Sequence, residues 1–266
     1  MNFSIVLSTQ PSSFSALAYK GDLAGNIAKI GKLGFDGVEL AIRDPEQLDM
    51  PFLRSVLEEH RLPVPAIGTG QAYGEEHLSF TDPDRNVRER AVERIKSHAR
   101  IARELNALVI IGLIRGKKHP DLSRETAETY FCEALKNCAS SSPSVRFAIE
   151  PINRYETDLL NDVQSGLRFL ERLGQDNIGL LLDTFHMNIE EPNLIESIRL
   201  ARTRLFHFHV ADSNRWYPGA GHIDFRSVLA TLDDIDYSGF VSAEILPMPD
   251  PDSAAKNTIE SLRKFR

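Results

Sequence analysis

The feature that most constrains the fold is an alternation of two patterns. Short apolar runs rich in β-branched residues alternate eight times with longer stretches of helical periodicity. The runs predicted as strands cover residues 3–8, 37–42, 64–68, 108–113, 146–150, 178–183, 205–210 and 240–245. Helices are predicted near residues 22–33, 50–60, 84–106, 123–140, 162–174, 192–202, 225–233 and 252–265. Several runs are apolar throughout, which is typical of parallel strands covered on both faces.

Eight strand–helix units in 266 residues match the size of an α/β fold of the (β/α)8 TIM barrel type. We predict one such domain over residues 1–266. A doubly wound open sheet is the alternative, but the first predicted strand is followed by LSTQP and not by a G-x-G-x-x-G turn. No segment rich in Pro, Gly or Ser is long enough to separate two domains.

Composition narrows the classes of partner and compartment. The net charge is −7, and the basic residues between 85 and 100 alternate with Glu and apolar residues, as on a solvated helix face. We therefore expect no nucleic-acid partner. No apolar run reaches the roughly 18 residues of a membrane helix, and the N-terminus lacks the features of a signal peptide. With only Cys132 and Cys138, both in one predicted helix, we expect no disulfide and a cytoplasmic location.

Metal-ligand residue types stand at or near the ends of the last four predicted strands. They are Glu150, Asp183, His209 and Glu244. A barrel gathers the carboxyl ends of its strands at one rim, where its active site lies. An acidic residue that closes an apolar strand is costly to desolvate unless it is paired, so four such positions on one rim predict a bound cation.

The ligand types favour one divalent ion bound mainly by oxygen, with Mn²⁺ expected first and Mg²⁺ or Co²⁺ as alternatives. A structural zinc site is not expected, because the sequence lacks the paired cysteines that such sites use. His207 and His209 have the same strand parity and are predicted to face the same side, opposite Phe206 and Phe208. We expect His209, nearer the strand end, to be the ligand and His207 to be a hydrogen-bonded core residue.

Four long motifs then carry a family resemblance: EPINRYETDLLN at 150–161, DTFHMNIEE at 183–191, HFHVADSNRWYPGAGHIDF at 207–225 and SAEILP at 242–247. In these the chain resembles the ketose 3-epimerases related to D-tagatose 3-epimerase, within the xylose isomerase-like TIM barrel superfamily. AIGTGQAYG at 66–74 and VIIGLIRG at 109–116 further resemble a subgroup described as 5-keto-L-gluconate epimerases.

The resemblance implies an isomerase that inverts C3 of an unphosphorylated ketose or keto-sugar acid, with substrates of the D-tagatose, D-psicose, L-ribulose or 5-keto-L-gluconate type. It places the metal ligands on Glu150, Asp183, His209 and Glu244, with Glu150 and Glu244 as acid and base. It places the substrate-orienting residues on Glu156, His186 and Arg215. It also implies a homo-oligomer, either a dimer or a tetramer.

Further residues are candidates for contacting the sugar. Gln71, Tyr73 and Arg115 follow the third and fourth predicted strands, and Arg115 or Lys117 would suit the carboxylate of a keto-acid. Trp216, next to Arg215, is a candidate to stack on the sugar or wall it off. His222 and Asp224 could add a metal contact, although loop packing and helix capping are equally compatible with their positions.

Alternatives from other classes remain. A hydroxypyruvate isomerase or a sugar dehydratase could use the same metal site. An apurinic endonuclease of this fold would need histidines directly after the third and fourth strands, whereas His77 and His119 lie well beyond those ends. A non-catalytic sugar-binding module would not need two glutamates that flank a metal.

Overall fold

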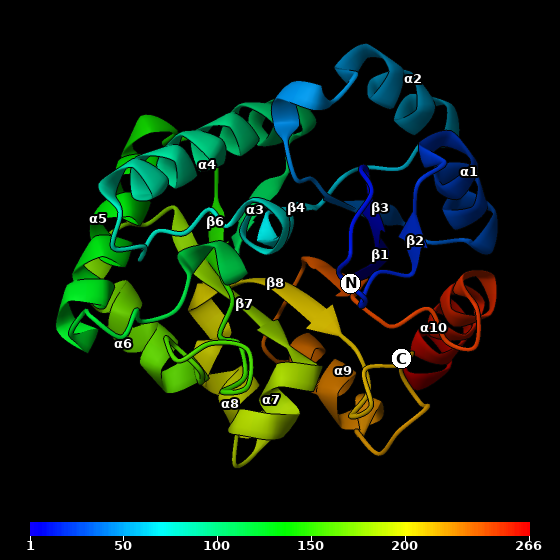
Figure 1. The fold of residues 1–266 in the computed structure, drawn as a ribbon. Coiled ribbons are helices and arrows are strands. Elements are labelled where there is room, and N and C mark those ends of the chain that lie inside the picture. Colours follow the sequence, from blue (N-terminus) through cyan, green and yellow to red (C-terminus); the bar gives the residue numbers. More distant parts are fainter.

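The computed structural model describes residues 1–266 and contains a closed barrel of eight parallel strands surrounded by helices (Figure 1). The barrel strands are β1 (Asn2–Ser8), β3 (Gly37–Ala41), β4 (Ala66–Gly68), β5 (Leu108–Ile111), β6 (Phe147–Ile149), β7 (Ile178–Asp183), β8 (Leu205–Val210) and β9 (Phe240–Ala243). Strand β1 also pairs with β9, which closes the ring. The predicted TIM barrel is confirmed. The short strand β2 (Tyr19–Lys20) pairs with the end of β1 outside the ring.

Helices follow the strands along the chain. They are α1 (Leu23–Leu33), α2 (Met50–His60), α3 (Gly70–Glu76), α4 (Arg85–Leu105), α5 (Arg124–Ser141), α6 (Val163–Leu173), α7 (Thr184–Glu190), α8 (Leu194–Ala201), α9 (Phe225–Asp234) and α10 (Pro251–Phe265). Helices α3 and α7 lie at the rim of the barrel, and the others cover its outside (Figure 1). Helix α10, at the end of the chain, packs beside α1 and completes the outer layer (Figure 1).

Local sequence sets where these helices begin and end. Aspartates accept backbone N–H bonds at several N-termini: Asp22 binds the Gly25 N–H at 3.1 Å and Asp162 binds the Ser165 N–H at 2.7 Å. Helices α1 and α6 end at Gly34 and Gly174, whose φ angles of 86° and 61° lie in the left-handed region that glycine adopts without strain.

Two helices were not predicted from the sequence. Helices α3 and α7 begin directly after β4 and β7, and each is one or two turns long. Helix α3 contains Gly70 and Gly74, and α7 contains Thr184, Phe185 and an isoleucine, so neither shows strong helix propensity. Their positions on the rim of the barrel stabilise them through tertiary contacts. Both helices contribute side chains to the site described below.

The buried apolar residues form an outer layer and an interior group. The main cluster lies between strands and helices and includes Phe208, as its predicted orientation requires. Phe206 instead packs against the separate interior cluster, which corrects the prediction that both phenylalanines face outward. The pairing of β7 with β8 shifts at this point, so Phe206 is an extra residue in a β-bulge that redirects its side chain. Gly179 makes room for it, because a Cβ there would lie 2.4 Å from the Phe206 ring.

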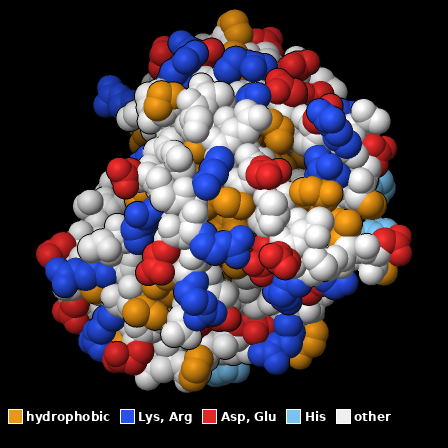
Figure 2. Space-filling model, turned by 90° about the vertical axis from the view of Figure 1, so that its left-hand side faces the viewer, with side chains coloured by type: hydrophobic (Ala, Val, Ile, Leu, Met, Phe, Trp, Pro, Cys, Tyr) orange, Lys and Arg blue, Asp and Glu red, His pale blue; other side chains and the backbone are white.

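One face of the molecule carries charged side chains of both signs. On the face drawn in Figure 2, Lys and Arg side chains are interspersed with Asp and Glu. This mixture is typical of a solvated surface and differs from the concentrated basic face of a nucleic-acid-binding protein. None of the helices has both the length and the apolar character needed to cross a membrane.

Candidate active site

The four predicted ligands lie together at the carboxyl ends of β6 to β9. Asp183, His209 and Glu244 place ligand atoms within 4.8 Å of one another, and Glu150, Asp183 and His186 form a second such group that shares Asp183. Asp183 uses Oδ1 to cap α7 through the Phe185 N–H at 2.7 Å, which leaves Oδ2 turned to His209 Nδ1 at 3.9 Å. The architecture therefore converges these side chains on one small volume.

The atoms in this volume fit a divalent cation. Glu150 Oε1, Asp183 Oδ2 and His209 Nδ1 are buried and have no hydrogen-bond partner. Burial raises the pKa values of Glu150, Asp183 and Glu244, and neighbouring carboxylates raise them further. Several buried acidic groups without enough cations to balance them are unfavourable, and a bound divalent ion would supply the missing charge and coordinate the unpaired atoms.

Glu39 backs His209, and sequence reasoning missed it. Its carboxylate lies at the centre of the barrel, 1% exposed, and contacts His209 Nε2 at 2.9 Å and His207 Nε2 at 2.7 Å. Because His209 uses Nε2 for Glu39, its Nδ1 is the atom that faces the ligand cluster. Burial alone would lower the pKa of His209, but Glu39 and then Glu244 and Glu150 outweigh it and raise that pKa to about 10. His207 is a buried, hydrogen-bonded residue, as predicted.

The signal for Glu39 was present in the sequence. An acidic residue stands in the middle of GVELA, an otherwise apolar strand whose five residues are all buried. A carboxylate in such a position requires hydrogen-bond donors in the barrel interior. The two histidines of β8, which share strand parity, are those donors.

The predicted substrate-orienting residues form a hydrogen-bonded chain beside the ligands. Arg215 donates to Glu244 Oε2 at 2.9 Å and to Glu156 Oε1 at 3.1 Å. Asn153 donates to the same Glu156 oxygen at 3.0 Å and contacts His186 Nδ1 at 2.7 Å. His186 Nε2 lies 3.7 Å from Glu150 Oε1. The chain of contacts thus runs from Glu244 to Glu150, and Asn153 is a member that sequence reasoning did not single out.

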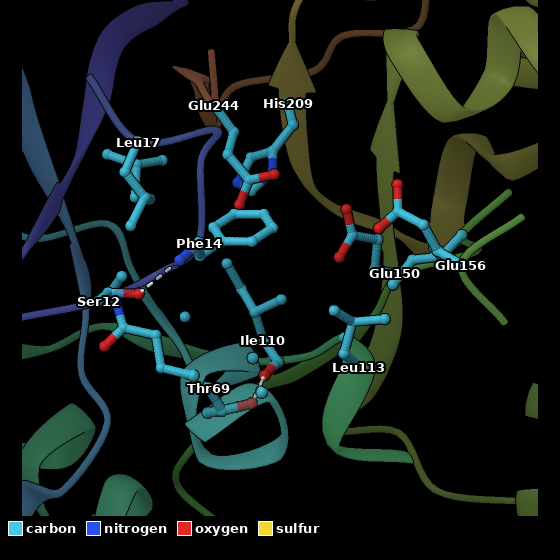
Figure 3. A pocket seen from close by; sticks show the side chains of 18 of the residues that line it. Ser12, Phe14, Leu17, Thr69, Ile110, Leu113, Glu150, Glu156, His209 and Glu244 are labelled. Atoms are coloured by element: carbon cyan, nitrogen blue, oxygen red, sulfur yellow. Dashed lines mark hydrogen bonds between the residues drawn. The ribbon is translucent and has the colours of Figure 1, made fainter. Parts of the chain in front are cut away.

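Glu156 is not paired with Arg154, its neighbour along the chain. Arg154 forms an ion pair with Glu190, with Nη2 and Oε2 at 2.8 Å. Glu156 is therefore available to Arg215 and Asn153. In Figure 3, Glu150 and Glu156 lie on one side of the cavity, and His209 and Glu244 come from another.

An apolar wall faces this polar rim. The cavity is lined by Phe14 and Leu17 from the segment after β1, and by Ile110, Leu113 and Ile152 (Figure 3). Phe14 also lies over Arg215, whose Cζ is 5.4 Å from the centre of the ring. The segment that carries Phe14 is tied to α3, because the Ser13 backbone N–H and hydroxyl both donate to Glu75 Oε1 at 2.7 Å.

Four residues after the third and fourth predicted strands were candidates for contacting the sugar, and of these only Gln71 lines the cavity. Its Nε2 donates to Ser8 Oγ at 2.7 Å, and Ser8 Oγ donates to the Gln10 carbonyl at 2.6 Å. The serine hydrogen is used on Gln10, so Ser8 can only accept from Gln71. Gln71 Oε1 is consequently the free atom, and it is buried without a partner. It is an acceptor without a donor in a wall of the cavity.

Arg115 lies elsewhere than expected. It is fully buried, and its guanidinium donates to the backbone carbonyls of Leu159, Glu150 and Leu160. These bonds hold the segment after β6 and turn the charge away from the cavity. The lining residues also do not include Tyr73 or Lys117.

The loop that follows β8 is organised by its own hydrogen bonds. Trp216 is not among the lining residues, and its backbone N–H and carbonyl bind Asn214 and Asp212 within the loop. His222 is exposed and its Nδ1 contacts Ser213 Oγ at 2.9 Å. Asp224 caps α9 through the Ser227 N–H at 3.2 Å. Loop packing and helix capping therefore account for both His222 and Asp224.

Comparison with known proteins agrees with this geometry. A model of the xylose isomerase-like TIM barrel family matches residues 27–265. An L-ribulose 3-epimerase from Methylomonas sp. strain DH-1 is 31% identical over 255 residues, which cover 92% of this chain and 87% of that protein. A D-psicose 3-epimerase from Ruminiclostridium cellulolyticum is 31% identical over 239 residues, which cover 85% of this chain and 79% of that protein.

A solved structure gives the same result in three dimensions. The crystal structure of a D-allulose 3-epimerase from Methylomonas sp., in complex with D-allulose, superposes with a TM-score of 0.85 at 26% sequence identity. The alignment covers 100% of this chain and 97% of that one. The relatives carry the names of sugar epimerases, which does not favour the isomerase or dehydratase alternatives.

Proposed function

The chain belongs to the xylose isomerase-like TIM barrel family, and from this premise we propose that it is a metal-dependent epimerase that inverts C3 of an uncharged ketose. The observation that carries the proposal is the rim cluster of Glu150, Asp183, His209 and Glu244, with its buried, unpaired ligand atoms. The names of the relatives support the same reaction, and epimerases are enzymes of the isomerase class.

We assign the cation to these four residues and expect Mn²⁺, with Mg²⁺ or Co²⁺ as substitutes. A divalent ion bound there acts as a Lewis acid, which stabilises negative charge on substrate oxygens next to the reacting carbon. The four residues carry a combined charge of −3 when His209 is neutral, and a divalent ion offsets part of this charge. The unpaired Asp183 Oδ2 and His209 Nδ1 support this assignment.

Glu150 and Glu244 are proposed as the acid and base. Inversion at C3 requires removal of a proton from one face of the carbon and return of a proton to the other. The two carboxylates follow different strands, β6 and β9, and enter the cavity from different sides (Figure 3). Their roles exchange when the reaction runs in reverse.

Arg215 and His186 are proposed to hold the sugar oxygens beside the reacting carbon. Arg215 is the only lysine or arginine among the lining residues. Hydrogen bonds to Glu156 and Glu244 fix its guanidinium. Such preorganised donors stabilise negative charge as it forms on an oxygen.

The charges of the cavity favour an uncharged substrate. Its lining includes five glutamates, and its single arginine is already paired with two of them. Arg115 offers nothing to a carboxylate or phosphate because it binds backbone carbonyls. In the wall of the cavity, the unpaired Gln71 Oε1 is suited to accept a hydrogen bond from a sugar hydroxyl. The lining offers no unpaired Lys or Arg side chain to the carboxylate of a 5-keto-gluconate.

The first experiment is product analysis in D₂O with Mn²⁺, a panel of ketoses and keto-sugar acids, and an EDTA control. We expect metal-dependent C3 epimers that carry deuterium at C3, with uncharged ketoses preferred. C1–C2 isomerisation or loss of water would instead favour a hydroxypyruvate isomerase or a dehydratase. A preference for keto-acids would overturn the substrate class and leave the reaction type intact.

Two variants test the roles of the glutamates. Glu150→Gln and Glu244→Gln should each lower the epimerisation rate about 100- to 10,000-fold. If each glutamate serves one face, each variant should still exchange deuterium into only one of the two C3 epimers, and the two variants should select opposite epimers. Equal exchange into both epimers by either variant would contradict the two-face mechanism.

A further inference from the structure

Asn153, like Gln71, carries a carboxamide at the site. It is not one of the four predicted ligands, but it contacts two of the predicted substrate-orienting residues, Glu156 and His186. It follows β6 in the segment between the two glutamates Glu150 and Glu156, and it is 1% exposed. Its Oδ1 accepts the Tyr155 backbone N–H at 3.0 Å. Because the oxygen is committed to this backbone donor, the orientation of the amide is fixed, and the Nδ2 atom faces the site.

The fixed amide determines where the proton of His186 lies. Asn153 Nδ2 is 2.7 Å from His186 Nδ1 and 3.0 Å from Glu156 Oε1. An amide nitrogen donates and does not accept, so His186 Nδ1 must be the acceptor. The ring proton of a neutral His186 then lies on Nε2, the nitrogen 3.7 Å from Glu150 Oε1.

His186 is 2% exposed, so little solvent reaches its ring nitrogens. A neutral imidazole with its proton on Nε2 is a hydrogen-bond donor at that nitrogen, and His186 is one of the residues that line the cavity.

We propose that Asn153 is a positioning residue that holds His186 as the Nε2–H tautomer, so that the imidazole donates to an oxygen of the bound sugar. The inference rests on the proposed function for the identity of the acceptor, and on the hydrogen bonds alone for the tautomer. It also explains why Asn153 contacts Glu156: one amide group sets the direction of both side chains that flank the sugar.

Asn161 provides a matched control. It lies in the same loop between β6 and α6, and its Nδ2 donates to the Ile152 and Thr157 carbonyls at 2.7 and 2.8 Å. It therefore supports the loop that carries Asn153 without touching His186. A variant at this position reports on loop structure and leaves the tautomer unchanged.

The experiment is ¹⁵N NMR of histidine-labelled protein, with the His186 signals assigned through His186→Gln. In the parent and in Asn161→Ala, we expect a protonated Nε2 and an unprotonated Nδ1. Asn153→Asp replaces the donor with an acceptor, so the proton should move to Nδ1 or the ring should become an imidazolium. We expect kcat to fall at least about 10-fold in Asn153→Asp while KM changes less, because a donor to the transition state is lost.

The results test the role of Asn153 separately from the proposed epimerase function. A protonated Nδ1 in the neutral ring of the parent would overturn the proposal, whether or not the variants fold. Equal losses of kcat in Asn153→Asp and Asn161→Ala, with His186 unchanged in both, would reduce Asn153 to a structural role. If the parent has the expected tautomer but epimerises no ketose, the proposed function fails and the assignment of the tautomer stands.

Discussion

The interior of the barrel has two halves of opposite character. Between β4 and β7 it is filled by a small apolar cluster that consists of Ala66, Leu108, Ile110, Ala148 and Leu181. From β8 through β9 and β1 to β3, the interior holds four polar side chains beside the apolar Val6, Ala41 and Phe206: His207, Ser242, Ser4 and Glu39, each at most 1% exposed. Both halves are equally inaccessible to solvent, so exposure does not explain the difference.

The two halves have different roles: the apolar residues stabilise the barrel by packing, and the polar residues position His209. Apolar interior residues stabilise the barrel by burial and provide Ile110 to the cavity wall. Buried polar groups are costly unless they are hydrogen-bonded, and the polar half uses Glu39 to hold His209 directly below the ligand cluster. Substitutions in the two halves should therefore affect different measurements.

The largest effect on stability is expected from the apolar half. Leu108→Ala should lower the free energy of unfolding by about 2–5 kcal/mol, because it removes a buried side chain and leaves a cavity. Urea unfolding of the metal-free protein measures this loss. The Kd for Mn²⁺ is measured by calorimetry at a temperature where the variant is folded. It should change less than about threefold, which corresponds to about 0.7 kcal/mol of binding free energy. A tenfold change would mean that the two halves are not separate.

The polar half should show the opposite pattern. Glu39→Gln puts an amide NH₂ where two histidine N–H groups need acceptors, so His209 loses its orientation. Affinity for Mn²⁺ should fall about 10- to 100-fold, the usual cost of removing the partner of a ligand histidine.

His98→Gln is the control for this variant. His98 is fully buried and contacts two backbone carbonyls, those of Arg94 and Ile42, at 2.8 Å each. Its replacement should destabilise the fold and leave Mn²⁺ affinity unchanged. If both variants lose affinity equally, the effect of Glu39 is general destabilisation.

The same contrast explains what could be predicted from the sequence. The barrel, its eight strands and the convergence of Glu150, Asp183, His209 and Glu244 were predictable, because apolar runs define parallel strands and parallel strands end at one rim. The contacts of single side chains were not. Arg115 follows β5 in the position of a pocket residue, yet its length lets it reach carbonyls behind the rim.

The polar interior was also hard to predict. The partner of His207 and His209 is 168 and 170 residues away, across the barrel, and no local pattern pairs them. The walls of the cavity were missed for a related reason: Phe14 lies in an irregular segment that is placed by a contact between Ser13 and Glu75 on α3. These features depend on tertiary structure and leave little periodic signal.

A moderate effect is expected from pH, and it comes from the titratable residues at the rim of the barrel, not from its apolar interior. Burial and neighbouring carboxylates raise the pKa of Glu150 and of Glu244, and the pKa of His209 is raised to about 10. The folded metal-free protein therefore binds these protons more tightly than the unfolded chain does. The resulting stability is present at low pH and is lost as the pH rises through the folded-state pKa values.

A bound cation should remove this dependence, because metal binding displaces the protons. The Tm of EDTA-treated protein should fall between about pH 6 and about pH 9, and the gain in Tm on adding Mn²⁺ should grow over the same interval. Thermal unfolding with and without Mn²⁺ at several pH values measures both trends. A gain that is constant with pH would show that the carboxylates and His209 are already without their extra protons in the metal-free protein.

The smallest change in stability is expected at buried serines of the polar half, which differ in whether their hydroxyl groups have hydrogen-bond partners. Ser242 and Ser4 are opposite each other in the pairing of β1 with β9, and both hydroxyl oxygens are buried without a partner. Ser242→Ala should therefore be neutral or stabilise the protein by up to about 1 kcal/mol, since it removes an unpaired polar group. Ser8→Ala, which breaks bonds to the Gln10 carbonyl and to Gln71, should cost about 1–2 kcal/mol. Urea unfolding compares the two, and a clear loss in Ser242→Ala would reveal a buried water that bridges the hydroxyls.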